Sequence, residues 1–270
     1  MLPDEMMIIR NVPLDEDVHI RILSDLHVGS KQFNEKAYDL WRQSIRPKDL
    51  IVIVGDLMDN GLKSSYGSYE QTMMPNAQRE YIYQTLKQFA GTGQILCCVG
   101  GNHENRTSKE TDEYPLYSVL CRMKEEDKYR RGGCFVKLRF GGSEDRKKRN
   151  GRYRPTYNIA VLHGNAGGMY VSSSGAKAER FAMGISNCDL LISGHTHRPL
   201  TFPLSHIAFP DNKNATMVKK QMAVVIASSY LNYGGYALEK MLPSTAMCSQ
   251  EIILSARGKH IQVVHGVEVE

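Results

Sequence analysis

The chain has 270 residues, of which 41% are hydrophobic and 23% charged, with a net charge of +5. This composition is typical of a globular protein with a sizeable core, and we expect a single domain over residues 1–270. No stretch approaches the about 18 uninterrupted apolar residues of a transmembrane helix. Residues 1–17 carry acids where a signal peptide carries basic residues. We therefore expect a cytoplasmic protein with no membrane partner.

Alternating strand and helix patterns run along the chain. Near-continuous apolar and β-branched runs predict strands covered on both faces, over residues 18–23, 50–54, 94–99, 158–162, 189–193, 223–228 and 251–256. Helical spacing predicts helices over residues 34–45, 76–89, 114–126 and 175–185. Asn34 and Asn76 are the expected N-caps of the first two, and Leu40 is expected on a buried stripe. The order predicts an α/β fold with two sheets face to face and helices outside.

Side chains that can bind metals follow the first five predicted strands. The strands end in SDLHVGS, GDLMDNG, GGNHENR, HGNAGG and GHTH. A single His or Asp after a strand is commonly a turn or capping residue, but five such ends in succession indicate a site. Ligands bind at the carboxyl ends of strands in open α/β sheets, so we expect these side chains to converge. The candidate metal ligands are Asp25, His27, Asp56, Asn102, His163, His195 and His197.

The chemistry of this set points to phosphate-ester hydrolysis. Carboxylate, imidazole and amide donors without a thiolate suit divalent ions such as manganese, iron or zinc. Seven donors exceed the needs of one tetrahedral ion and would fill two sites that share a carboxylate. Two ions about 3.5 to 4 Å apart can hold a phosphoryl group and lower the pKa of a bound water.

The motif series DxH, GDxxD, GNH[DE], a later His before Gly, and GHxH resembles that of the calcineurin-like metallophosphoesterase superfamily, and it is complete over residues 25–197. The resemblance implies a four-layer α-β-β-α sandwich of two mixed sheets flanked by helices. It also implies a metal-dependent phosphoric ester hydrolase with two divalent ions, Mn²⁺ foremost, with Fe, Zn or Ni as alternatives. By resemblance Asp25, His27 and His197 would hold one ion, Asn102, His163 and His195 the other, and Asp56 would bridge them.

The resemblance also assigns roles outside the ligand set. His103 would be the general acid, and Asp59 and Glu104 would orient His103 or other ligands, although each could instead be a turn, capping or buried structural residue. Protein Ser/Thr phosphatases of this superfamily carry a phosphate-binding Arg after GDxxD, whereas this chain has Asn60. Arg106 could supply the missing guanidinium or form a surface salt bridge. A typical protein phosphatase is therefore disfavoured.

Three stretches, YEQTMMPNAQ, HGNAGG and SSYLNYGGYALEKMLPSTAMCS, resemble a narrower group of phosphoesterases from phage and prophage genomes. Residues 229–248 follow the last candidate ligand and are rich in Tyr, Ser and Gly. Tyr230, Asn232 and Tyr233 could line the pocket or pack within a surface loop. Long loops are expected over residues 61–75 and 141–155.

We expect the substrate to be a phosphate ester, and the charge of the site bears on which class of ester. Residues 128–154 contain eleven Lys or Arg against two acids, so they could contact nucleic acid or form a solvated loop. A phosphodiesterase or nuclease is favoured, because a diester has one negative charge fewer than a monoester and needs less neutralisation. The alternative is a phosphomonoesterase for protein or nucleotide substrates, since the chain has no appended domain. A third hypothesis is a non-catalytic nucleic-acid-binding protein on the same fold.

Overall fold

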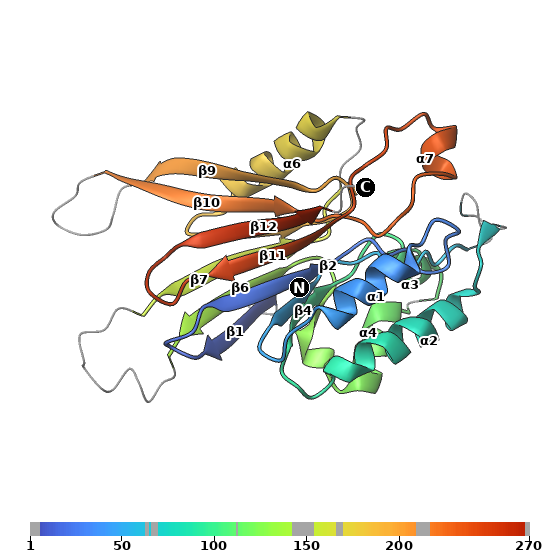
Figure 1. Ribbon diagram of the computed structural model, residues 1–270, viewed down its shortest axis with the longest axis horizontal. Coiled ribbons are helices and arrows are strands. Elements are labelled where there is room, and N and C mark those ends of the chain that lie inside the picture. The colour runs from blue at the N-terminus through green and yellow to red at the C-terminus, as the bar shows by residue number, and fades with distance from the viewer. Residues whose placement is uncertain are drawn as a thin grey trace.

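Two six-stranded sheets pack face to face at the centre of this computed structural model (Figure 1). The structure describes residues 6–62, 65, 70–111, 113–141, 154–165, 170–208 and 217–267. Across the first sheet lie β1 (Met7–Val12), β6 (Cys134–Phe140), β7 (Thr156–Leu162), β8 (Leu190–Ser193), β10 (Val218–Ile226) and β9 (Leu200–Ala208). Across the second lie β12 (Ile261–Val267), β11 (Cys248–Leu254), β2 (Val18–Leu23), β3 (Leu50–Ile53), β4 (Ile95–Val99) and β5 (Tyr129–Arg130). Both sheets mix parallel and antiparallel pairs.

Helices cover the outer faces of both sheets (Figure 1). They are α1 (Glu35–Gln43), α2 (Pro75–Leu86), α3 (Glu104–Thr111), α4 (Pro115–Met123), α6 (Val171–Met183) and α7 (Tyr236–Glu239), with 3-10 turns over Lys87–Phe89 and Glu126–Lys128. Beneath α6, Ala182 packs in a cluster with Leu191 and Val224 of the first sheet. Trp41, Ile82 and Leu120 of α1, α2 and α4 pack against strands of the second sheet. The predicted α/β fold of two mixed sheets flanked by helices is confirmed.

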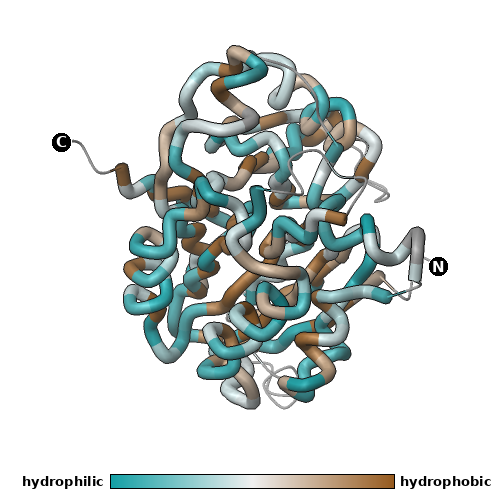
Figure 2. The backbone as a smooth tube through the Cα atoms, turned by 90° about the vertical axis from the view of Figure 1, so that its right-hand side faces the viewer, coloured by the Kyte–Doolittle hydropathy of each residue, from teal (hydrophilic) through white to brown (hydrophobic). Residues whose placement is uncertain are grey.

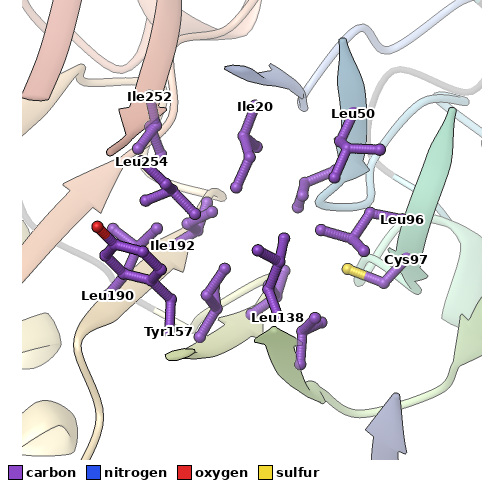
Figure 3. Packing of buried hydrophobic residues seen from close by; sticks show 14 of the residues in the cluster. Ile20, Leu50, Leu96, Cys97, Leu138, Tyr157, Leu190, Ile192, Ile252 and Leu254 are labelled. Atoms are coloured by element: carbon purple, nitrogen blue, oxygen red, sulfur yellow. The ribbon is translucent and has the colours of Figure 1, made fainter. Parts of the chain in front are cut away.

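The largest apolar cluster lies between the sheets (Figure 3). Ile20 and Leu96 of the second sheet and Leu138 and Leu190 of the first belong to it, each at most 2% exposed. In Figure 2 the hydrophobic segments run largely through the interior, while the outer coils are mostly hydrophilic. None of the helices in the described ranges has the length and apolar character needed to cross a bilayer. The strands that carry the site are thus fixed by a core shared between the two sheets.

All seven predicted strands are present, with ends shifted by a few residues. Five further strands, β1, β5, β6, β9 and β12, were not predicted. In β6, Lys137 and Arg139 interrupt the apolar run, and the residues alternate between buried and half-buried. Strands β9 and β12 lie at sheet edges and are largely exposed. A search for continuous apolar runs misses such strands, because only one of their faces is covered.

The four predicted helices are also present, with two corrections. The side chain of Asn34 accepts from the backbone N–H of Ala37 at 2.9 Å, which confirms this N-cap. The prediction for Asn76 is wrong, because α2 already begins at Pro75, a residue that suits the first turn of a helix. Leu40 is 47% exposed instead of buried, whereas Tyr38 of the same helix is fully buried.

We expect Leu138→Ala to lower the free energy of unfolding by about 2–5 kcal/mol, because the truncation leaves a cavity between the two sheets. Urea denaturation followed by circular dichroism measures the change. The matched control is Leu40→Ala, at an exposed helical position, for which we expect a change within about 0.5 kcal/mol. Equal effects of the two substitutions would contradict the placement of the core.

Candidate metal centre

Five loops at the carboxyl ends of β2, β3, β4, β7 and β8 meet at one end of the sandwich. The first three strands run parallel in the second sheet, and the last two run parallel in the first. A side chain at Gly194, after β8, would overlap Ser24 and Asp25, after β2. Glycine at this position therefore permits the two sheets to bring their strand ends into contact.

The seven predicted ligands lie together in two groups. One donor atom from each of Asp25, His27 and His197 lies within 4.8 Å of the others. The same holds for Asp56, His163 and His195. These two groups separate the residues in nearly the same way as the motif resemblance did.

Asn102 and Asp56 connect the arrangement. The Oδ1 atom of Asn102 lies 2.7 Å from Nδ1 of His195 and 3.0 Å from Nε2 of His163, so Asn102 belongs with the second group. Asp56 Oδ2 lies 3.1 Å from His163 Nε2 and 3.9 Å from His27 Nε2. Asp56 thus stands between the two groups, as a bridging carboxylate would. That these residues are metal ligands stays a prediction.

The chemistry of the donor atoms around His163 fits a cation. The Nδ1–H of His163 donates to the carbonyl oxygen of Val54 at 2.6 Å. Burial lowers the pKa of His163, but the hydrogen bond with Asp56 outweighs it and raises that pKa to about 10. Without an ion, Nε2 therefore holds a proton toward Asp56 Oδ2 at 3.1 Å, and it lies 3.0 Å from Asn102 Oδ1. A divalent ion bound among these atoms would take the place of that proton, because a metal-binding imidazole must offer a lone pair.

The other group has the same character. The Nε2 atoms of His27 and His197 lie 3.1 Å apart, and Oδ1 of Asp25 lies 3.3 Å from the latter. Burial, reinforced by the charge of His103, lowers the pKa of His27 to about 3, so its ring is neutral and free to donate a lone pair. Burial alone would raise the pKa of Asp25, but its hydrogen bond with His197 holds it below its usual range. A neutral imidazole beside a charged carboxylate is the state that divalent ions bind.

Backbone strain is concentrated at the same positions. Positive φ values occur at Asp25 (52°), His27 (49°), Asp56 (51°), His195 (72°) and His197 (57°). Residues other than glycine rarely adopt this left-handed region, and such strain persists only where neighbours hold it, commonly at functional sites. The backbone N–H groups of Asp25 and His27 donate to the carbonyls of Gly55 and Asp56, both at 3.0 Å.

His103 lies beside the donor groups. Its Nδ1 donates to the backbone oxygen of Asp59 at 2.8 Å and lies 3.3 Å from the Asp59 carboxylate. Burial lowers the pKa of His103, but the hydrogen bond with Asp59 outweighs it and raises that pKa. His27, Asp59 and His103 also form a third group whose donor atoms lie within 4.8 Å. The geometry thus allows Asp59 to orient His103, and it makes His103 a rival candidate ligand.

Glu104 has a different position from the one expected for a residue that orients His103. Its carboxylate is 1% exposed and accepts from the backbone N–H groups of Asp56, Met58 and Gly101, at 2.9, 3.0 and 3.0 Å. Burial and the nearby Asp56 charge raise the pKa of Glu104 to about 7. Glu104 therefore ties the loop after β3 to the loop after β4, and through that contact it positions Asp56.

Asn60 does not take over the phosphate contact of the missing arginine. Its side chain is buried and donates to the backbone oxygen of His103 at 2.9 Å and to Oγ1 of Thr107 at 2.6 Å. These bonds attach the GDLMDNG loop to the first turn of α3. Arg106, in contrast, lines the open cleft, with its guanidinium 3.2 Å from the Asp59 backbone oxygen and 2.9 Å from His103 Nε2.

A cleft with a volume of about 650 Å³ opens over these residues. Of the three predicted rim residues, Asn232 and Tyr233 line it, but Tyr230 does not. Tyr230 is 5% exposed and packs against Tyr38, with ring centroids 6.4 Å apart. It belongs to the apolar cluster between the second sheet and its helices. Arg198, which sequence reasoning did not single out, also lines the cleft directly after the GHTH motif.

Only part of the basic segment over residues 128–154 can be placed, because residues 142–153 lie outside the described ranges. The guanidinium of Arg131 lies 4.8 Å from the ring centroid of Tyr114, and Arg130 donates to the Asp127 backbone oxygen at 2.7 Å. None of the described residues of this segment lines the cleft. A contact between this segment and nucleic acid stays a prediction.

Comparison with known proteins agrees with the motif series. The family model described as calcineurin-like phosphoesterase matches residues 18–199. No curated protein matches the chain. Among solved structures, Vps29 of Chaetomium thermophilum is similar, with 13% identity, a TM-score of 0.40, and coverage of 94% of this chain and 97% of that chain.

We expect Glu104→Gln to lower the free energy of unfolding by about 1–3 kcal/mol, because the new amide would place a donor against backbone N–H groups. After dialysis against a divalent ion, the variant should also hold less metal than the wild type, because the Glu104 carboxylate no longer fixes the backbone of Asp56. Urea denaturation and elemental analysis measure the two effects. Glu179→Gln, at an exposed position of α6, is the control and should change neither quantity. An unchanged Glu104→Gln protein would show that this bridge between loops is dispensable.

Proposed function

The chain belongs to the calcineurin-like phosphoesterase family, and on that premise we propose that it is a dinuclear metal-dependent phosphodiesterase. Members of this family hydrolyse phosphate esters at metal centres. The observation that carries the proposal is the pair of donor groups joined by Asp56, in which imidazole and carboxylate atoms of each group lie within 4.8 Å of one another. Such an arrangement is what two divalent ions would complete.

The residues of the two groups would hold one ion each. Asp25, His27 and His197 would bind the first, Asn102, His163 and His195 the second, and Asp56 both. We propose Mn²⁺, with Fe, Zn or Ni as alternatives, because the donors are hard to borderline. The chemistry that two such ions supply when bound is polarisation of phosphoryl oxygens and a lowered pKa for a water molecule.

His103 has the position of a proton donor. Asp59 holds its Nδ1, which leaves Nε2 directed to the cleft beside Arg106. In the free cleft Nε2 accepts from the Arg106 guanidinium at 2.9 Å, so we propose that Arg106 turns to the phosphoryl oxygens when the substrate binds, which leaves Nε2 to hold a proton. When water attacks phosphorus and the ester P–O bond breaks, the departing oxygen takes that proton, and the Asp59 contact stabilises the positive ring beforehand. The residue therefore acts on the leaving group.

The buried Asn60 supports a diester more than a monoester. It occupies the position after GDxxD at which protein Ser/Thr phosphatases carry a phosphate-binding Arg, so that cation is missing, while Arg106 lines the cleft and can hold non-bridging oxygens. A site with fewer cations suits the single negative charge of a diester better than the two of a monoester. The cytoplasmic location and the kinship with phage enzymes stay predictions.

We expect the Mn²⁺-loaded protein to hydrolyse bis-p-nitrophenyl phosphate with a higher kcat/KM than p-nitrophenyl phosphate. Both reactions release the same chromophore, so absorbance compares them directly, and protein treated with a chelator is the control. A higher kcat/KM for the monoester would make the chain a phosphomonoesterase. No turnover of either ester by protein that holds two ions would favour the non-catalytic binding protein.

We expect His103→Ala to lower kcat about 100-fold or more while two metal ions remain bound. The reason is that a positioned proton donor lowers the activation barrier but does not itself hold the metal ions. Steady-state kinetics and elemental analysis measure the two quantities. His206→Ala, at an exposed position of β9, is the control and should change neither. If His103→Ala binds one ion fewer, the third group of His27, Asp59 and His103 is the true second site.

A further inference from the structure

One side of the cleft is built by a segment far along the chain from most of the donor groups. We call residues 231–245 the cleft wall. They surround α7, the orange-red segment at one end of the molecule in Figure 1. Leu231, Tyr233, Leu242 and Pro243 of this wall line the cleft together with His103 and Arg106. The cleft thus has a metal-competent polar side and a largely apolar side.

Backbone hydrogen bonds fix the wall relative to the donor groups. The N–H of Tyr230, just before the wall, donates to the backbone oxygen of Asp25 at 3.1 Å, and the N–H of Asn34 donates to that of Tyr230 at 2.8 Å. The N–H of Asn232 donates to the backbone oxygen of Gln32 at 2.8 Å. The wall is therefore attached to the same loop that carries the first candidate ligands.

Tyr233 presents a fixed aromatic ring on this wall. It is 49% exposed, and its hydroxyl donates to the backbone oxygen of Leu242 at 2.9 Å. The bond holds the far end of the side chain, so the ring loses little freedom when a ligand packs against it. An exposed, held ring that lines a cleft is a suitable stacking platform for a planar group.

A second guanidinium accompanies the ring. Arg198 lines the same cleft, and within the described part of the chain it has no carboxylate partner. It follows His197 directly, so it lies beside the first donor group. A cleft of about 650 Å³ is larger than a phosphoryl group requires, and its remaining volume is bounded by an aromatic ring and a free cation.

The two sides of the cleft divide the ester groups of a diester. The departing oxygen must lie near His103, which bonds to Asp59 and Arg106. The wall, in contrast, bonds to Gln32 and Asn34 through Asn232. Resting on the proposed function, we propose that the wall binds the ester group that stays on phosphorus, and that this group is a nucleoside whose base stacks on Tyr233. The substrate class is then a nucleotide phosphodiester.

Two diesters with the same leaving group test the proposal: thymidine 5′-(p-nitrophenyl phosphate) and methyl p-nitrophenyl phosphate. We expect the wild-type protein to prefer the thymidine diester about tenfold or more in kcat/KM, in line with the usual strength of base–aromatic stacking. Tyr233→Ala should bring the ratio of the two kcat/KM values close to one, through a higher KM for the thymidine diester. Tyr233→Phe should keep the preference, because it retains the ring.

Tyr233→Phe is also the matched control for loss of the hydroxyl bond to Leu242, which both variants lack. Calorimetric titration of the same three proteins with thymidine 5′-monophosphate measures binding without turnover, and Tyr233→Ala should bind about tenfold more weakly. Equal kcat/KM values of the wild type for the two diesters, or equal losses in the Phe and Ala variants, would overturn the proposal. If neither diester is hydrolysed, the proposed function fails, and the calorimetric comparison still decides whether the wall binds a nucleoside.

Discussion

A hydrogen bond between the ends of two sheets is the contact on which the site depends. The backbone N–H of His195, after β8, donates to the carboxylate of Asp25, after β2, at 3.1–3.2 Å. Gly194 permits this approach because a larger residue would overlap Ser24 and Asp25. Each sheet contributes only some of the donor groups, so a metal-competent centre exists only where the two strand ends meet. The shared core between the sheets maintains that meeting.

The centre is preorganised by groups that do not themselves face the cleft. The Glu104 carboxylate accepts hydrogen bonds from three backbone N–H groups, including that of Asp56. The Asn60 side chain attaches the loop after β3 to the start of α3. These buried contacts hold the strained, left-handed backbone of the donor residues in place. Side chains that would otherwise repel one another therefore converge on two points, as a pair of divalent ions requires. The cost of this strain is offset by the surrounding hydrogen bonds.

The cleft combines this centre with a surface of different chemistry. His103 and Arg106 come from the segment at the start of α3, whereas the apolar wall comes from the segment between β10 and β11. In the proposed function, cleavage and selection of the substrate belong to separate parts of the chain. The wall is joined to the loop after β2 by a backbone hydrogen bond from Asn232 to Gln32 and by a side-chain hydrogen bond from Asn34 to Asn232.

Much of this arrangement was predictable, and the failures share a physical cause. Continuous apolar runs marked seven strands, of which β2, β3, β4 and β8 are buried almost throughout, but β6, β9 and β12 escaped because polar residues interrupt their apolar runs or because they lie at an edge. Tyr230, for which the pocket rim and a surface loop were the alternatives, is buried instead, and Leu40 was wrongly placed in the core. Aromatic and apolar side chains carry no local signal that separates packing in the core from lining a cleft, since distant segments decide which side of the residue is covered.

The sequence by itself determined which residues can bind metal and at which strand ends they lie, because motif spacing and side-chain chemistry are local properties of the chain. Only the tertiary structure decided how the five strands divide between the two sheets, and that the carboxyl ends of β2 and β8 come into contact. It also decided that Asn60 is buried while Arg106 lines the cleft, and that the wall carrying Tyr233 faces the donor groups. These outcomes depend on contacts between residues distant in sequence, which packing of the two sheets alone creates.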